Sequence, residues 1–195
     1  MGSREKILDN ISRHKSELKH LPDQKKPGQD PTDAAMKFSS VLQQIGGKAV
    51  EIKNWNSLKD YIDQHYKGML RIVSTVSQLP WTVDKLSDDP HTFEDVDLAI
   101  LQGHFGVAEN AAVWITDELM GDRALPFIAQ NLALVIKKNS IVPTLHQAYE
   151  KIDSQVYNFG TFIAGPSKTA DIEQSLVLGA HGPKSMVVFL MESGQ

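Results

Sequence analysis

The residues with the clearest chemical potential lie between Gly165 and Pro183, in the stretch GPSKTADIEQSLVLGAHGP. Ser167, Lys168 and Thr169 stand between an apolar run and a segment with helical spacing, which predicts a strand, a tight turn and a helix. The unpaired N–H groups of a helix start, a cation and two hydroxyls together suit a carboxylate or a phosphate. In a parallel sheet such a turn lies at the carboxyl edge, where ligands bind. The hydroxyls could instead only cap the helix, and both interpretations stay open.

Two carboxylates lie inside the predicted helix, which covers 169–179. Glu173 is four residues after Thr169 and shares its face, next to apolar positions. From a half-buried position Glu173 could move a proton, or it could simply face water or a cation. Asp171 lies in the first turn, where a negative charge favours the helix dipole. The candidate site therefore has ligand-binding residues followed by acid–base candidates: Gly165, Ser167, Lys168 and Thr169, then Asp171 and Glu173.

His181 follows the predicted helix and precedes the second Gly-Pro step. A helix of about ten residues is roughly 15 Å long. If the next strand is parallel, His181 lies at the opposite end of the sheet from Ser167, and the two cannot share a site within one chain. An antiparallel last strand, or an interface between subunits of a homo-oligomer, could bring them together. His181 is thus either a catalytic candidate or a structural hydrogen-bonding residue.

A second candidate lies in GHFGVAENAAVWI, from Gly103 to Ile115. Glu109 stands between two apolar runs, and a carboxylate held between buried strands could act as a base or a nucleophile. Alternatively, Glu109 faces water in a turn whose geometry Asn110 supplies. The chain carries no HExxH, phosphate-loop, dinucleotide-binding or GxSxG motif. The motifs therefore predict no metal site and name no cofactor.

Composition narrows the classes of function. The 195 residues contain no cysteine, which excludes disulfides, cysteine-held zinc or iron–sulfur clusters and a thiol nucleophile in this chain. The formal net charge is −4, yet residues 1–30 carry a net +2, so the rest is mildly acidic. That balance disfavours nucleic acid as a partner. Neither a signal-peptide core nor a run of about 20 apolar residues is present, so we expect no membrane span and a cytoplasmic protein.

The elements that must position these residues alternate along the chain. Residues 1–30 predict a helical arm with a narrow apolar stripe and a linker rich in Pro, Gly and Lys, and 31–195 predict one α/β domain. Its apolar runs lack strict alternation, which is typical of strands buried on both faces, so we expect a layered, mostly parallel or mixed sheet flanked by helices. The predicted helices are 4–21, 33–47, 56–66, 142–152 and 169–179. The predicted strands are 48–52, 70–74, 96–103, 111–117, 132–138, 158–165 and 185–191, of which those within 96–138 should be antiparallel or mixed.

The segment from Gly165 to Pro183 closely resembles the C-terminal signature of the LUD-domain family, of the lactate utilisation protein C type. That signature reads Gly-Pro-Ser-basic-Thr-Ala-Asp-Ile-Glu, a few apolar residues and Gly-x-His-Gly-Pro, and every position is filled here. The resemblance covers most of 31–195. It implies a fold of the NagB/RpiA/CoA-transferase type and a role in oxidising L-lactate to pyruvate beside two iron–sulfur proteins.

Three functions follow as hypotheses. The first is a non-iron–sulfur component of an L-lactate-oxidising system that binds a small anionic metabolite at the Ser167–Glu173 turn. The second is a stand-alone enzyme of the CoA-transferase or sugar-phosphate-isomerase type, with Glu109 catalytic. The third is a structural or regulatory subunit that docks through the stripe of Ile7, Ile11 and Leu18. Whether the chain is itself an enzyme stays open between them.

Overall fold

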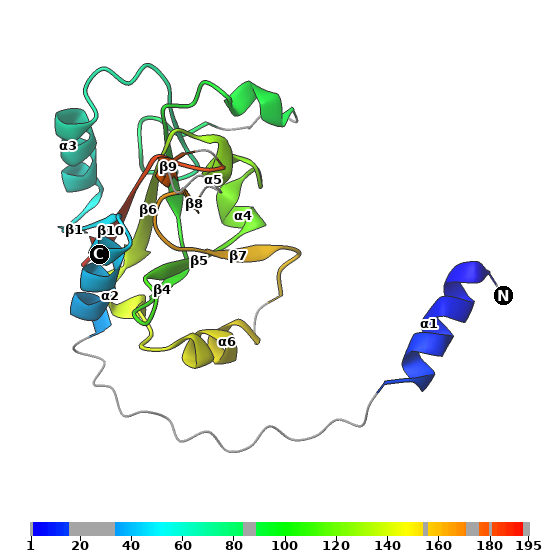
Figure 1. Cartoon of the computed structure of the whole chain (residues 1–195). Coiled ribbons are helices and arrows are strands. Elements are labelled where there is room, and N and C mark those ends of the chain that lie inside the picture. Colours follow the sequence, from blue (N-terminus) through cyan, green and yellow to red (C-terminus); the bar gives the residue numbers. More distant parts are fainter. Residues whose placement is uncertain are drawn as a thin grey trace.

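The core of the fold is a five-stranded parallel sheet (Figure 1). The computed structural model describes residues 2–15, 34–83, 89–153, 156–170, 176–179 and 181–192. The sheet has the order β1-β10-β6-β3-β2, and every neighbouring pair is parallel. Its strands are β1 (Lys48–Ile52), β2 (Ile72–Ser74), β3 (Leu98–Gln102), β6 (Asn131–Lys137) and β10 (Ser185–Met191). The predicted α/β class and all five of these strands are confirmed.

Helices cover both faces of this sheet, as its two-sided apolar strands require. Met186, Val188 and Leu190 of β10 pack in one core cluster with helix α2 (Ala34–Gln44). Val187 and Phe189 point the opposite way and pack in a second cluster with helix α3 (Trp55–His65). Successive strand residues therefore alternate between two buried layers, and the sheet is sandwiched rather than exposed to water on one side.

A second, antiparallel sheet holds the middle of the chain. It consists of β4 (Phe105–Val107), β5 (Ala112–Thr116) and β7 (Gly160–Ile163), in that order. Helix α6 (Leu145–Asp153) lies beside it, and Ala148 and Ile152 share a buried cluster with Phe105 and Trp114. The expectation for 96–138 is thus half confirmed, because β3 and β6 join the parallel sheet while β4 and β5 form the antiparallel one.

The helix predicted at 169–179 is wrong. Strands β8 (Lys168–Ala170) and β9 (Leu176–Leu178) pair antiparallel instead. The N–H of Gly179 donates to the Ser167 carbonyl at 3.2 Å, which continues the pairing beyond β9. The two candidate carboxylates, Asp171 and Glu173, lie outside the described residues.

Short helices connect these strands, and the sequence patterns did not predict them. They are η2 (Pro90–Phe93), α4 (Asp117–Met120), α5 (Leu125–Ile128) and η3 (Lys138–Ser140). Helix α4 follows β5 directly, and α5 lies just before β6. Each has only three or four residues, which is too short for an apolar period to show.

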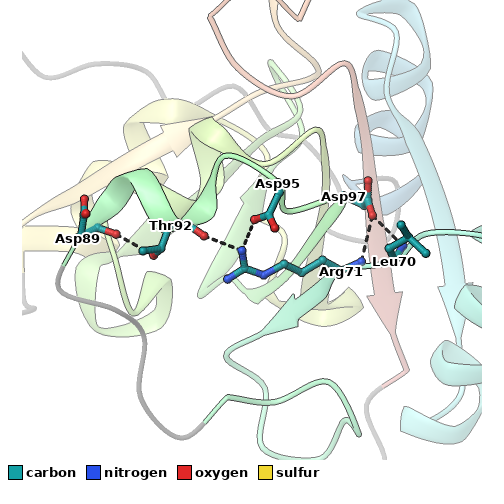
Figure 2. Close-up of polar contacts among 6 residues, drawn as sticks. All are labelled: Leu70, Arg71, Asp89, Thr92, Asp95 and Asp97. Carbon is teal, nitrogen blue, oxygen red and sulfur yellow. Dashed lines mark hydrogen bonds and ion pairs between the residues drawn. The ribbon is translucent and has the colours of Figure 1, made fainter.

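A polar latch fixes the beginnings of β2 and β3 (Figure 2). The Asp97 carboxylate accepts the N–H groups of Leu70 at 2.8 Å and Arg71 at 3.0 Å. The Arg71 guanidinium donates to the Thr92 carbonyl at 2.6 Å and pairs with Asp95. These contacts join η2 to the amino edge of the parallel sheet, so their role is structural.

The N-terminal arm contains helix α1 (Ser3–Arg13), which has no buried residue. Ile7, Leu8 and Ile11 are 53–56% exposed, so the narrow apolar stripe faces solvent. The helix predicted at 4–21 is confirmed as far as Arg13, and 16–21 lie outside the described residues. None of the described helices is both long enough and apolar enough to cross a membrane.

Candidate functional site

The two Gly-Pro turns form one hollow of about 310 Å³, here called the Gly-Pro hollow. Its walls come from α5, the end of β7, the turn after β7 and the loop before β10. The described residues that line it are Pro126, Phe127, Phe162, Ile163, Ala164, Gly165, Pro166, Ser167, Lys168, His181, Gly182 and Pro183.

Backbone hydrogen bonds bring the two ends of the motif together. The Ser167 N–H donates to the Pro183 carbonyl at 2.9 Å. A Cβ atom on Gly182 would lie only 3.2 Å from Ser167 Cβ, so the backbones approach closely. Ser167 and His181 therefore line the same hollow within one chain. The expectation that they lie at opposite ends of the sheet is wrong, because a hairpin rather than a helix separates them.

The hollow also lies at the other edge of the sheet from the one expected. The turn at Gly165 follows β7, which belongs to the antiparallel sheet. Pro183 lies two residues before β10, and Phe127 lies in the helix before β6. The hollow thus lies where the parallel strands begin, so the rule that ligands gather at their carboxyl ends does not apply to it.

Lys168 sets the charge of the hollow. It is the only Lys, Arg, Asp or Glu among the described lining residues, and its side chain is exposed. The side chain runs along Gly46, where an added Cβ would be 3.1 Å from both Cε and Nζ. Gly46 has φ +90° at the C-terminal end of α2. The ammonium therefore lies near the negative end of a helix dipole, which stabilises a cation.

The other predicted residues fall into two groups. Gly165 has φ +70°, the left-handed conformation that this turn needs, and Thr169 is the central residue of β8. Glu109 is exposed, and its Oε2 accepts the Leu145 N–H at the start of α6 at 2.8 Å. The Asn110 side chain accepts the Ala112 N–H at 3.1 Å. Glu109 is thus placed as the turn interpretation expects, away from the Gly-Pro hollow, and its catalytic role stays a prediction.

A second cleft gathers residues that the sequence did not single out. Its inner part, which is partly open to solvent, measures about 140 Å³, and its more open outer part about 610 Å³. We call the two together the His104 cleft, because His104 and Thr116 both line the inner cavity and His104 Nε2 lies 2.9 Å from Thr116 Oγ1. The inner cavity is lined by His104, Thr116, Asp117, Glu118, Val156, Tyr157 and Asn158. The outer part is lined by Pro90, Asp117, Glu118, Gly121, Asp122, Arg123, Ala124 and Asn158.

Burial and charge shape this cleft differently from the hollow. Burial lowers the pKa of His104, nearby Lys151 lowers it further, and the negative charge of Glu118 opposes the shift. The Arg123 guanidinium, 2.9 Å from Asp117, holds the pKa of that carboxyl below its usual range. Over the described part of the chain, no group of three or more His, Asp or Glu side chains could hold a metal ion.

No sequence signal could have identified His104 and Thr116 as a pair. They are twelve residues apart and belong to no spacing motif. The β4–β5 pairing, in which Phe105 faces Trp114, is what places them side by side.

Comparison with known proteins now places the chain. A family model described as LUD domain matches residues 76–191, more than half of the chain. The chain belongs to the LUD domain family. Every described residue lining the Gly-Pro hollow and the His104 cleft falls within this LUD match.

Individual relatives agree with the LUD assignment. The chain is 28% identical over 150 residues to Lactate utilization protein C of Anoxybacillus flavithermus, covering 73% of this chain and 64% of the relative. The protein of that name from Bacillus subtilis is 29% identical over 117 residues, which covers 57% of this chain and 49% of the relative. The one from Bacillus pumilus is 30% identical over 174 residues, covering 83% and 70%. The chain thus spans about half to just over two thirds of the length of these relatives.

The fold has a solved counterpart. A crystal structure of a DUF162 family protein from Deinococcus radiodurans superposes with a TM-score of 0.63 at 17% identity, covering 84% of this chain and 99% of that one. At this identity the likeness supports the fold alone.

Proposed function

We propose that this chain is a non-iron–sulfur component of a system that oxidises L-lactate to pyruvate. We further propose that it binds a small carboxylate anion such as L-lactate or pyruvate in the Gly-Pro hollow. Two observations support the proposal. Its relatives carry the name Lactate utilization protein C, and the family signature forms the hollow itself.

The charge of the hollow carries the argument. Lys168 is an unopposed cation among the described lining residues, so a carboxylate is favoured over a cationic ligand. Ser167 and His181 add a hydroxyl and an imidazole at the same hollow, and these can hydrogen-bond a hydroxyl or a keto oxygen. Phe127 and Phe162 provide apolar wall for a methyl group. These are the three kinds of group that L-lactate and pyruvate present.

The remaining signature residues take supporting roles in this proposal. Gly165 lets the turn form, Thr169 adds a binding hydroxyl, and Asp171 or Glu173 orients the ligand or moves a proton. Oxidation of L-lactate releases two electrons, and this chain has no cysteine with which to hold a cluster. We therefore assign the electron acceptors to two iron–sulfur partner proteins, in the cytoplasm, with 31–195 as the ligand-binding domain.

A titration of the purified full chain with L-lactate and pyruvate tests the proposal. At 100 times its Kd, a ligand adds about 2.7 kcal/mol of stability. At roughly 2–4 °C per kcal/mol for a domain of this size, the Tm should rise by about 5–10 °C. Lys168→Gln should weaken binding at least tenfold. Lys184→Gln removes an equal charge just outside the described lining, where Lys184 Nζ donates to Gln130 Oε1 at 3.0 Å, and should change binding less than twofold.

The outcomes separate this function from the enzyme that uses Glu109. Glu109→Gln should leave the affinity for L-lactate unchanged, since Glu109 is not among the described residues of the hollow. If neither anion raises the Tm, or if the two lysine variants lose affinity equally, anion binding at the hollow is wrong.

The exposed stripe of α1 favours a second candidate, a docking role. The apolar face of α1 consists of Ile7, Leu8 and Ile11. All three side chains are exposed, and no residue of this helix is buried. A chain that lacks residues 1–21 should still bind L-lactate but should no longer copurify with its partner proteins. Copurification that survives the deletion would remove the docking role of α1.

A further inference from the structure

The His104 cleft lies at the edge of the parallel sheet where ligands usually bind. His104 comes two residues after the end of β3, at the carboxyl end of that strand. Thr75 follows β2 directly, and its hydroxyl donates to the Leu119 carbonyl in α4 at 2.8 Å. Helix α4, which carries Asp117 and Glu118, is therefore held at the same edge. Open α/β sheets place their ligand crevices there.

A hydrogen-bonded pair, His104 and Thr116, lines the inner cavity. Thr116 is 4% exposed, and its hydroxyl contacts His104 Nε2 at 2.9 Å. The hydroxyl can donate one hydrogen bond and accept two, so a single contact leaves capacity for another partner. Burial keeps the pKa of His104 low, so the neutral ring offers both a donor and an acceptor at neutral pH. This pair can recognise a hydroxyl group.

The charged side chains that line the inner cavity favour a ligand with one sign of charge. Asp117 and Glu118 line the inner cavity, and no described Lys or Arg does. Asp117 is already paired with Arg123, which lines only the outer part. Glu118 is exposed and has no ion-pair partner within the described ranges. Lys151 of α6 acts on His104 from outside this lining, and it lies over the Phe105 ring at 4.6 Å. A cation is thus favoured inside, and an anion is not.

The size of the inner cavity limits what can enter. Its 140 Å³ corresponds to roughly four or five waters at about 30 Å³ each. A small end group fits there, while the outer part of about 610 Å³ leaves room for the rest of a larger molecule.

We propose that the His104 cleft is a second ligand-binding site, which takes a small molecule ending in a hydroxyl and a protonated amine, as in an amino alcohol. The hydroxyl bonds to His104 and Thr116, and the ammonium pairs with Glu118. The Asn158 side chain, exposed in the lining of both parts, can accept a further N–H bond. The site differs from the Gly-Pro hollow in residues, charge and sheet edge, and it does not depend on lactate binding.

Three probes of similar size test this proposal by the sign of their charge. They are 2-aminoethanol, ethylene glycol and glycolate, which share a hydroxyl and are cationic, neutral and anionic at neutral pH. Titration of the full chain, followed by the NMR signal of the His104 ring, should show saturable binding of 2-aminoethanol. Ethylene glycol should bind at least tenfold more weakly, and glycolate should leave the His104 signal unmoved. The His181 signal reports the Gly-Pro hollow in the same spectra.

Two carboxylate variants provide a matched control. Glu118→Gln should weaken 2-aminoethanol binding at least tenfold, to the level of ethylene glycol. Asp122→Asn removes the same charge from the outer part only and keeps the Oδ1 that accepts the Ala124 N–H at 2.7 Å, so it should change binding less than twofold. Thr116→Val should weaken the binding of both 2-aminoethanol and ethylene glycol. An unmoved His104 signal, equal binding of glycolate, or equal losses in the two carboxylate variants would each overturn the proposal, whatever the lactate titration shows.

Discussion

The Gly-Pro hollow and the His104 cleft are built in opposite ways. The Gly-Pro hollow draws its polar side chains from the two ends of one signature segment, and these carry a single described charge, the cation of Lys168. The His104 cleft collects residues from Pro90 to Asn158 around a buried hydrogen-bonded pair, and its charge is mainly negative. One lies where the parallel strands begin, the other beside the carboxyl end of β3.

This contrast shows which kind of site can be recognised from a sequence and which cannot. Residues that lie close together along the chain form a readable pattern even when the predicted secondary structure between them is wrong. A pair such as His104 and Thr116 exists only through the β4–β5 pairing, and no spacing rule contains it. The experiments that disturb one hollow and spare the other therefore test whether the two are independent.

The largest effect is expected from Gly160→Ala, which should damage the His104 cleft. Gly160 pairs with Thr116 across the antiparallel sheet. An added Cβ would lie 2.5 Å from Trp114 Cη2 and closer still to Cζ2. Trp114 packs edge-on against Tyr157, a lining residue, at 5.4 Å between ring centroids. Overpacking of this kind costs about 1–3 kcal/mol, which urea denaturation would measure.

The control is Gly2→Ala, because no atom lies within 4 Å of the added carbon there. That variant should unfold at the wild-type urea concentration. A loss of stability below about 0.5 kcal/mol in Gly160→Ala would show that the side chains around Trp114 can shift to accommodate the added methyl group. The packing of Trp114 would then not be what fixes the shape of the cleft.

A smaller effect, confined to the Gly-Pro hollow, is expected from Gly46→Ala. Gly46 has φ +90°, and an added Cβ would meet the end of the Lys168 side chain at 3.1 Å. The left-handed backbone should cost about 1–2 kcal/mol. The displaced ammonium should lower the affinity for L-lactate about tenfold in calorimetric titration.

Gly68→Ala separates these two causes. Gly68 has φ +88°, but no atom lies within 4 Å of an added Cβ. Its stability should therefore fall by a similar amount while the affinity for L-lactate stays unchanged. Equal affinities in the two variants would mean that the position of the Lys168 ammonium beside Gly46 does not matter for binding.

Much of the parallel sheet could be predicted from the sequence, because the central strands β3, β6 and β10 are nearly continuous apolar runs. The predicted bounds of β1 and β10 agree with the structure, and β6 differs by one residue. The helix predicted at 169–179 failed because Ile172, Leu176 and Gly179 fit a helical period, whereas pairing of Leu176–Leu178 with Lys168–Ala170 overrides that local preference.

The candidate site was predictable in composition but not in arrangement. The signature identified Ser167, Lys168 and His181, and all three line one hollow. The sheet edge could not be predicted, because β7 looks like any other apolar strand although it joins the antiparallel sheet. Strand β4 was missed because three residues, Phe105–Val107, are too short to separate from a turn.

The smallest effect is the response of stability to pH, and it distinguishes the two histidines. Burial holds the pKa of His104 below the unfolded value of about 6.5. As the pH falls through this value, the unfolded chain takes up a proton that the folded His104 resists. The free energy of unfolding should therefore decrease between pH 7.5 and 5.5. The groups that act on the ring are Glu118 of α4, which opposes the shift, and Lys151 of α6, which adds to it.

Urea denaturation of His104→Gln at the two pH values isolates this contribution. The variant should lose less stability on acidification than wild type, because it no longer carries the buried ring. His181→Gln, which changes the exposed histidine of the Gly-Pro hollow, should keep the wild-type decrease. A decrease that is identical in His104→Gln and wild type would mean that the ring is well solvated, and the cleft would then be as open to water as the hollow on the opposite edge of the sheet.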